Sequence, residues 1–248
     1  DFNINLKFME KNTKIKLYVG ISYLVLLSTF LFFFFSKFSL TEITSYDFIK
    51  ENSLYLLEFR NSNQFLVSII FLTLTILWVF PFLGFGSPIA LLGGFILGKW
   101  IGTIVVVLGL STGATFLYLF GNYFLKDIIR EKFLKKFQNL QIKFKKSEFL
   151  YLLIYRFCGG IPWQLSCILP TIFNVKVKNF FNATFIGIIP QIFLAVSIGS
   201  GLEKVIEQNS VAPGILDLIS TKDIYIPLII FVFLLFFSFL IRKIFYKS

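Results

Sequence analysis

Uncharged apolar stretches that are long enough to cross a lipid bilayer dominate this chain. Residues 17–36 are twenty consecutive uncharged residues, and residues 101–121 and 180–199 are similarly apolar. An α-helix rises about 1.5 Å per residue, so about 20 residues cross the roughly 30 Å hydrocarbon core of a bilayer. Hydrophobic residues make up 56 % of the chain, which is more than a soluble domain uses. The sequence therefore predicts an all-α polytopic membrane protein.

Two further apolar segments are broken by turn-forming residues. Residues 61–98 carry no charge apart from their flanks, but they are interrupted by prolines and glycines, namely Pro81, Gly84, Gly86 and Pro88. Residues 149–173 are interrupted at Gly159 and Gly160, and arms of about ten residues are too short to cross a bilayer. The breaks predict two re-entrant helical hairpins, at residues 65–98 and 149–173. Two complete crossings are the alternative for the first.

Basic residues gather beside particular segments, and this orients the chain. Eight of the 24 basic residues lie within residues 126–146, and four lysines precede residues 17–36. Cytoplasmic loops of membrane proteins carry such an excess of lysine and arginine. The pattern predicts a protein of a bacterial plasma (inner) membrane with both termini in the cytoplasm. The lysines expected at the membrane surface are Lys132, Lys135, Lys136, Lys143, Lys145 and Lys146. The alternative is that the basic segment only sets the topology.

These assignments give about four full transmembrane helices and two opposed re-entrant hairpins. Because a hairpin followed by a span occurs twice with opposite orientation, the sequence predicts an inverted repeat, whose substrate site lies where the broken segments meet. The predicted parts are a cytoplasmic N-terminus (1–16), a transmembrane anchor (17–36), an external loop (37–64), a core (65–205), a second external loop (206–223), a last transmembrane helix (224–241) and a cytoplasmic tail (242–248). The core comprises a hairpin (65–98), a span (101–121), a basic segment (126–147), a hairpin (149–173) and a span (180–199).

One arginine lies inside the second broken segment. Arg156 is surrounded by apolar residues, and a charge at the centre of a membrane helix costs about 2.5–3.5 kcal/mol on insertion scales. Only four of the 24 basic residues are arginine, so its use here suggests that planar, bidentate donor geometry matters. Phosphate and carboxylate both fit this geometry, and we predict that Arg156 binds a lipid phosphate. The alternative is that the side chain extends to the membrane interface.

Other residues near Arg156 complete the predicted substrate site. They are Pro162, Trp163, Gln164 and Gln191. For a single amide in a membrane, hydrogen bonding between helices is the alternative role. The glycines Gly109 and Gly113 are spaced for close helix packing, either within the chain or between two copies.

The composition argues against an enzyme and against a metal site. The chain contains no histidine and no paired carboxylates in its apolar segments, so the usual acid–base and metal-binding groups are missing. Cys158 and Cys167 lie in apolar sequence and are expected to be small core residues. We therefore expect no catalytic residue, cofactor or metal. The expected partners are membrane lipids, anionic lipids in particular, with a homo-oligomer as an option and no nucleic acid.

Two groups of motifs resemble a known family. The first group is the run from Pro88 to Gly98, followed by Gly109, Gly113 and Gly121. The second group is Tyr155-Arg156, Pro162, Asn179, Gly187, Pro190, Gly199 and Gly201. Their order and spacing, over roughly residues 65–205, resemble the VTT domain of the DedA / SNARE-associated Golgi protein superfamily.

The resemblance implies a fold with two opposed re-entrant loops and a role in moving lipids between leaflets. Eukaryotic members resemble phospholipid scramblases, and bacterial members are linked to polyprenyl phosphate. The resemblance also places Arg156 at the family's arginine in the second hairpin. One departure is clear, because members considered proton-coupled carry acidic residues around the first hairpin, whereas none occurs here between Glu58 and Asp127. This departure favours passive scrambling.

Three functions follow from these observations. The first is a lipid transporter or scramblase that moves a phosphate-bearing lipid, either a phospholipid or a polyprenyl phosphate. The second is an ion-coupled secondary transporter of a small solute, against which the missing intramembrane carboxylates argue. The third is a membrane scaffold without transport, which predicts that Arg156 tolerates replacement by glutamine.

Overall fold

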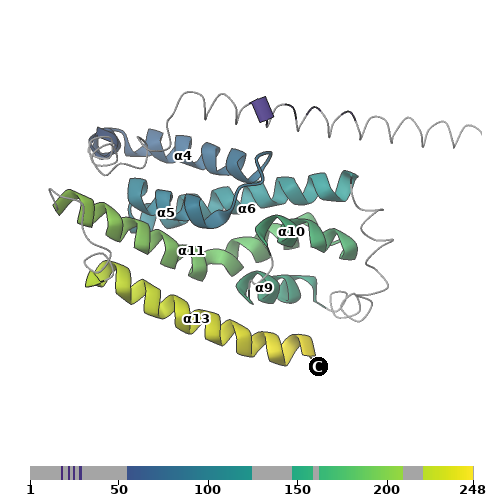
Figure 1. Cartoon of the computed structure of the whole chain (residues 1–248). Coiled ribbons are helices and arrows are strands. Elements are labelled where there is room, and N and C mark those ends of the chain that lie inside the picture. The colour runs from purple at the N-terminus through teal and green to yellow at the C-terminus, as the bar shows by residue number, and fades with distance from the viewer. Residues whose placement is uncertain are drawn as a thin grey trace, which may run out of the picture. The chain divides into compact units, whose positions relative to one another are not determined.

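The computed structural model describes residues 55–124, 147–158, 162–208 and 220–247, together with five separate positions between residues 18 and 29 (Figure 1). The chain divides into two compact units, residues 1–52 and residues 53–248. All helices discussed below belong to the second unit. The predicted anchor at residues 17–36 falls almost wholly outside the described residues. The turn glycines Gly159 and Gly160 and the six lysines predicted at the membrane surface also lie outside them.

The described residues are helical and contain no strand, which confirms the predicted all-α fold. A short helix at Tyr55–Ser62 meets the next helix at an angle of 114°. The elements that follow are α4 (Gln64–Val79), α5 (Gly86–Leu97), α6 (Lys99–Phe124), α9 (Glu148–Cys158), α10 (Trp163–Ile168), the 3-10 helix η2 (Leu169–Phe173), α11 (Val177–Gln208) and α13 (Lys222–Lys247).

Two of these helices, α6 and α11, are long and apolar enough to cross a membrane. The number rises to three if the bent pair of Tyr55–Ser62 and α4 counts as one broken span. Helix α13 is not one of these spans; its apolar stretch is described over Ile224–Leu234 only. The described part of the chain therefore supports a polytopic membrane protein with two or three spans, and the predicted count of four is not reached there.

Aromatic residues mark both ends of α6. Trp100 and Tyr123 are strongly exposed near its two ends, and the Lys99 ammonium lies 5.9 Å from the Trp100 ring centroid. The two aromatic residues are about 35 Å apart along an ideal helix axis. Tryptophan and tyrosine are enriched at the two interfaces of a membrane. The length of α6 and these end residues therefore match a full crossing.

The first helix pair reaches only partway along α6. Gly109 of α6 lies against Thr75 of α4, and Gly113 lies against Val79, so α4 and α6 run in the same direction. Helix α5 runs back, because its first residue Gly86 faces Leu110 of α6. The turn between α4 and α5 is therefore level with the middle of α6. The same contacts show that Gly109 and Gly113 pack against α4 of the same chain. Of the two possibilities given by the sequence, packing within the chain or between two copies, the structure has the first.

The turn between α4 and α5 is shorter than predicted. Helix α5 begins at Gly86 and includes Pro88 in its first turn. Proline is tolerated there, because backbone N–H groups of the first turn make no hydrogen bond within the helix. Only Pro81 and Gly84 of the four predicted turn residues lie in the connection. Gly84 has a packing reason to be glycine, since a Cβ atom there would collide with the Trp78 indole.

The second helix pair repeats this arrangement against α11. Glu148 at the start of α9 accepts a hydrogen bond of 2.8 Å from Asn179 Nδ2 of α11, and Arg156 near its end lies against Gly187. Helix α9 therefore runs in the same direction as α11, just as α4 runs in the same direction as α6. The two long helices are antiparallel, because Gly102 lies near Val196 while Tyr118 stacks on Phe180 with ring centroids 4.5 Å apart.

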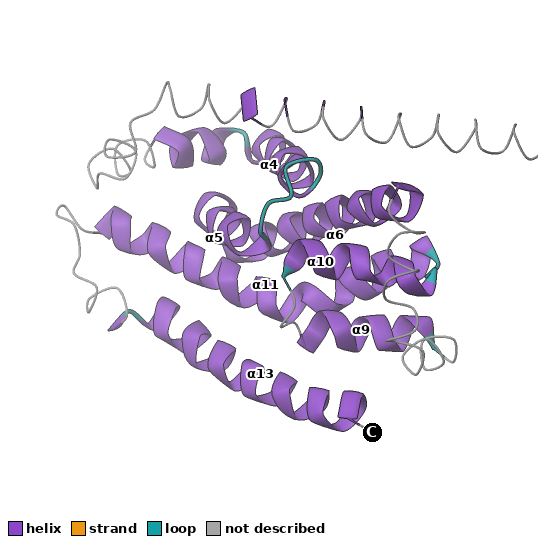
Figure 2. Cartoon of the chain, turned by 45° about the vertical axis from the view of Figure 1, so that its right-hand side comes forward, coloured by secondary structure: helices purple, strands orange, loops and turns teal. Residues whose placement is uncertain are grey.

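Two buried clusters hold the helices together. One joins α4, α5, α6 and α11 around residues such as Val106 and Val196, and the other joins α6, α9, α10 and α11 around Tyr118 and Phe180. Trp163 packs against both clusters. Helix α13 runs alongside α11 (Figures 1 and 2). The tips of the two helix pairs meet, because the Gln164 side chain of α10 donates to the Leu83 carbonyl in the turn between α4 and α5.

Candidate functional site

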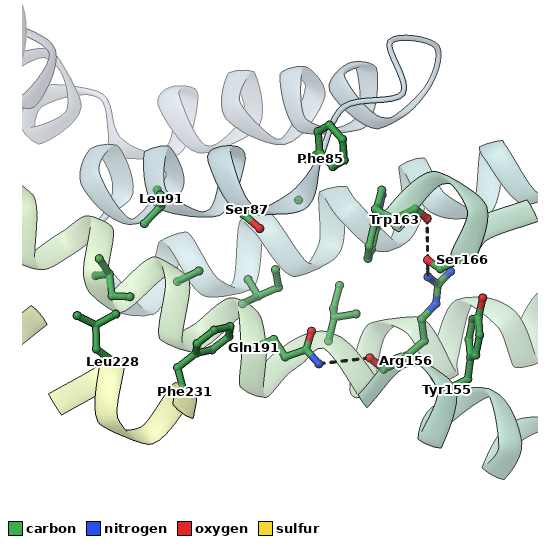
Figure 3. A pocket seen from close by; sticks show the side chains of 15 residues that line it. Phe85, Ser87, Leu91, Tyr155, Arg156, Trp163, Ser166, Gln191, Leu228 and Phe231 are labelled. Atoms are coloured by element: carbon green, nitrogen blue, oxygen red, sulfur yellow. Dashed lines mark hydrogen bonds between the residues drawn. The ribbon is translucent and has the colours of Figure 1, made fainter. Parts of the chain in front are cut away.

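A cavity of about 500 Å³ lies where the two helix pairs meet (Figure 3). The first pair contributes Phe85, Gly86, Ser87 and Leu91; the second contributes Tyr155, Arg156, Trp163 and Ser166. The remaining wall comes from α11 and α13, through Ile188, Gln191, Ile192, Ala195, Ile198, Leu228 and Phe231. The volume falls in the range of small-molecule sites.

Arg156 is buried within the protein, with 4 % of its surface exposed. Its Nε donates to Thr184 Oγ1 at 3.0 Å, and its Nη1 donates to Ser166 Oγ at 2.7 Å. Its Nη2 lies 3.6 Å from the Cys167 sulfur. The guanidinium is therefore held inside the helix bundle, and the alternative that it extends to the membrane interface does not describe this structure.

The positive charge of Arg156 has no carboxylate partner among the described residues. The one ion pair found in that part of the chain joins Arg60 to Glu203. The guanidinium instead lies near three aromatic rings, at 5.0 Å from Phe180, 5.1 Å from Trp163 and 5.9 Å from Tyr155. Such contacts stabilise a cation only modestly. An anion that entered the cavity would therefore meet a positive charge that is not neutralised by an acidic side chain.

Hydrogen-bond donors remain available around this charge. A guanidinium has five N–H groups, and the described residues provide acceptors for three of them. The Trp163 indole N–H is buried and has no partner in the described part of the chain. The single hydroxyl proton of Ser166 is already used, because it is donated to the Trp163 carbonyl at 2.6 Å (Figure 3). The site thus offers donors and few acceptors, which suits an anion.

The N-terminus of α5 adds to the positive character of the cavity. Helix α5 begins at Gly86, and no side chain caps its N-terminus. The N-terminus of a helix carries a partial positive charge and free N–H groups. Since Gly86 and Ser87 line the same cavity as Arg156, the helix end faces the space that an anion would occupy.

A close contact between α9 and α11 fixes the position of Arg156. A Cβ atom added to Gly187 would lie 2.7 Å from the Arg156 Cβ and 3.2 Å from the Leu153 carbonyl oxygen. Glycine at this position therefore lets α9 approach α11 closely enough for Arg156 to reach Thr184. The sequence motif contained Gly187 but gave no indication of this role.

The structure brings some of the predicted substrate residues together and separates others. Arg156, Trp163 and Gln191 line the cavity, and the Gln191 amide also donates to the Phe157 carbonyl. Gln164 does not line it; its amide donates to the Leu83 carbonyl and so ties the two hairpin tips together. Pro162 is exposed at the start of α10 and is also absent from the lining. The side-chain amides of Gln164 and Gln191 thus both make hydrogen bonds between helical segments, the alternative role given above.

Sequence reasoning missed four polar residues of the site. Ser166 and Thr184 hold the guanidinium, and Tyr155 and Ser87 line the cavity. Buried hydroxyls are common in membrane helices, where they bond to the backbone of their own helix. The spacing of Ser166 and Thr184 does not mark them, because they lie on α10 and α11 and meet Arg156 of α9 only in the folded chain.

The region that forms the cavity matches a known protein family. Residues 80–201, which hold most of the cavity wall, match the VTT domain family. This region of the chain is a VTT domain. Together with the apolar helices α6 and α11, the match identifies an integral membrane protein.

Two curated relatives are similar to the chain. One is a "Transmembrane protein 41 homolog" of Dictyostelium discoideum, 29 % identical over 121 residues, which cover 47 % of this chain and 36 % of the relative. Another protein of the same name, from Caenorhabditis elegans, is 28 % identical over 127 residues, which cover 50 % of this chain and 51 % of the relative. The matches thus span about half or less of these relatives. No solved structure matches the chain.

Proposed function

We propose that this protein moves a phosphate-bearing lipid between the leaflets of a membrane. In this proposal, Arg156 contacts the lipid phosphate inside the cavity where the two hairpin tips meet. The observation that carries it is the buried guanidinium with spare N–H donors and no acidic partner among the described residues. Arginine with free donors pairs well with phosphate oxygens.

The membrane position of the hairpins forms part of the proposal. We infer that both helix pairs are re-entrant, because the tip of the first is level with the middle of α6 and accepts a hydrogen bond from Gln164 at the tip of the second. Non-helical backbone at that depth is tolerated when it is buried in protein or lines a wet cavity. The bacterial plasma membrane, the cytoplasmic termini and self-association remain predictions from the sequence.

A leaflet-exchange assay tests the proposal directly. The full chain would be reconstituted into liposomes containing fluorescent anionic phospholipid, zwitterionic phospholipid or a polyprenyl phosphate. Wild type should exchange at least one of these lipids, and Arg156→Ala should lower that rate by about tenfold or more, as expected for loss of a charged hydrogen-bonding partner. The lipid exchanged fastest identifies the headgroup class.

Matched lysine substitutions separate charge from donor geometry. Arg156→Lys keeps the charge but loses the planar fork, so it should also exchange lipid slowly. Arg60→Lys serves as the control, because Arg60 lies outside the cavity lining and its lysine can still pair with Glu203. Wild-type exchange by Arg156→Ala would overturn the role of this arginine. Absence of exchange in the wild type would overturn lipid transport, and gradient-driven solute uptake would then be measured.

A further inference from the structure

The cavity has two chemically different ends. Five residues of α11 line it, at a spacing that keeps them on one helix face: Ile188, Gln191, Ile192, Ala195 and Ile198. From the first to the last, this face extends about 15 Å along the helix. Arg156, Trp163 and Ser166 gather at one end, whereas Leu91 and Leu228 lie toward the other end, on different walls (Figure 3). The cavity is thus an elongated space rather than a compact polar pocket.

The end away from Arg156 is apolar. Its lining comes from three helices, with Leu91 from α5, Ala195 and Ile198 from α11, and Leu228 and Phe231 from α13. None of these side chains can ionise or donate a hydrogen bond. Water gains little in such a space because it finds no polar partners, whereas a hydrocarbon group is favoured there in proportion to the apolar surface that it covers.

Helix α13 presents two different faces at this end. Leu228 and Phe231 are three residues apart, so they lie on the same side of the helix and line the cavity. Ile229, Val232 and Phe233 are strongly exposed on other sides. The sequence does not distinguish these faces, because the helix is apolar all round. The structure therefore distinguishes Leu228 and Phe231, which line the cavity, from apolar neighbours on the same helix that do not.

We propose that the apolar end binds a hydrocarbon chain of the same lipid whose phosphate is held at Arg156, and that Leu228 and Phe231 determine chain preference. This inference rests on the proposed function. A phosphate-bearing lipid is an amphiphile, and its charged head and apolar chain match the two ends of one continuous cavity. A water-soluble phosphate would fill only the polar end.

A pair of tryptophan substitutions tests the chain subsite. Phe231→Trp adds bulk inside the cavity, whereas Phe233→Trp makes the same change at a position that is 70 % exposed on the same helix. Exchange would be measured with phospholipids that share one headgroup and differ in chain length. Phe231→Trp should slow the long-chain lipid by about tenfold while changing the short-chain lipid by less than about twofold, since overpacking acts only where the chain lies. Phe233→Trp should leave both rates unchanged.

Photocrosslinking gives a second readout that does not depend on transport. A phospholipid with a diazirine at the end of its chain should label Phe231 in the wild type, and this labelling should disappear in Arg156→Ala. Labelling of the exposed Phe233 by bulk lipid should remain in both proteins. Labelling of Phe231 that persists in Arg156→Ala would mean that the chain enters independently of the headgroup, which overturns the proposal.

The outcomes distinguish this inference from the proposed function. If wild type exchanges no lipid, the proposed function fails. If exchange requires Arg156 but Phe231→Trp slows short-chain and long-chain lipids equally, lipid transport stands and the chain subsite is wrong. Equal effects of Phe231→Trp and Phe233→Trp would also overturn the subsite, because they would show a general disturbance of α13.

Discussion

At the scale of single residues, the chain holds the partly buried Arg60 and the buried Arg156 in different ways. Arg60 donates to Glu203 at 2.7 Å and to the Ile96 carbonyl at 3.2 Å, so its charge is neutralised by an acidic side chain. Arg156 bonds to hydroxyls and lies near a thiol, all of which are neutral. A buried charge is costly unless it is paired. We infer that retaining Arg156 in this state serves ligand binding rather than stability.

Removing the Thr184 hydroxyl should weaken both the fold and transport. Thr184→Val keeps the shape of the side chain but leaves the Arg156 Nε–H without its acceptor, a loss that costs about 1–3 kcal/mol. The expected results are a lower Tm in detergent and slower lipid exchange. Thr184→Ser retains the acceptor and should restore both. If Thr184→Val lowered the Tm but left exchange intact, Thr184 would be a structural residue only.

The contact between Gly187 and Arg156 leads to another prediction. Gly187→Ala places a methyl group 2.7 Å from the Arg156 Cβ, so α9 must move and carry the guanidinium with it. Lipid exchange should fall several-fold while the protein still inserts into membranes. Gly121→Ala is the matched control, because its nearest neighbour is the Ile168 Cγ2 methyl at 3.3 Å, a contact that a shift of a few tenths of an ångström relieves. Equal exchange by the two variants would contradict the prediction.

At the scale of helices, the contact between α5 and α11 is the least tolerant of change. A Cβ atom at Gly94 would lie 1.9 Å from the Val196 carbonyl oxygen, and one at Gly199 would lie 2.0 Å from that of Leu91. Both neighbours are backbone atoms, so the helices themselves would have to separate. Small residues that let helix backbones approach are a common basis of packing in membranes.

Gly94→Ala should therefore destabilise the protein more than Gly121→Ala does. Overpacking of a buried contact costs about 1–3 kcal/mol, and more where backbone must move. The measurement is the Tm of each purified variant by size-exclusion chromatography after heating in detergent. Similar Tm values for the two variants would show that α5 and α11 can separate at little cost.

Much of the helix arrangement could be predicted from the sequence, and the reason is physical. Uncharged length marks α6 and α11, and the Pro81–Gly84 break marks the turn between α4 and α5, because proline and glycine interrupt helices. The role of Gln164 could not be predicted, since its contact with Leu83 depends on how two distant hairpins meet. Leu228 and Phe231 were also missed, because no polar face distinguishes one side of α13 from another.

At the scale of the whole molecule, the distribution of acidic residues bears on the energy source of transport. Among the residues that the structure describes, no acidic side chain lines the cavity; Glu203 pairs with Arg60 and Glu148 accepts a hydrogen bond from Asn179, both outside the lining. Proton-coupled carriers rely on ionisable groups within the membrane. The cavity therefore fits passive exchange of lipid.

Lipid exchange should proceed at the same rate with and without an imposed proton gradient. The measurement uses the same proteoliposomes with a pH difference across the membrane, and an ionophore that abolishes the difference serves as the control. Because no described residue that lines the cavity is a carboxylate, we expect no coupling between protonation there and lipid movement. A rate that rises with the gradient would refute passive exchange, and Glu203→Gln would then test the buried acidic residue of α11.

The position of α13 in the chain has an evolutionary consequence. The VTT domain at residues 80–201 contains Arg156, Trp163 and Gln191, whereas Leu228 and Phe231 follow it. In the proposed function, head recognition is therefore encoded within the VTT domain, whereas chain recognition draws both on residues of that domain, such as Leu91 and Ile198, and on α13 beyond it. Changes in α13 would then adapt the chain preference to a membrane of different fatty-acid composition and leave Arg156 unaltered.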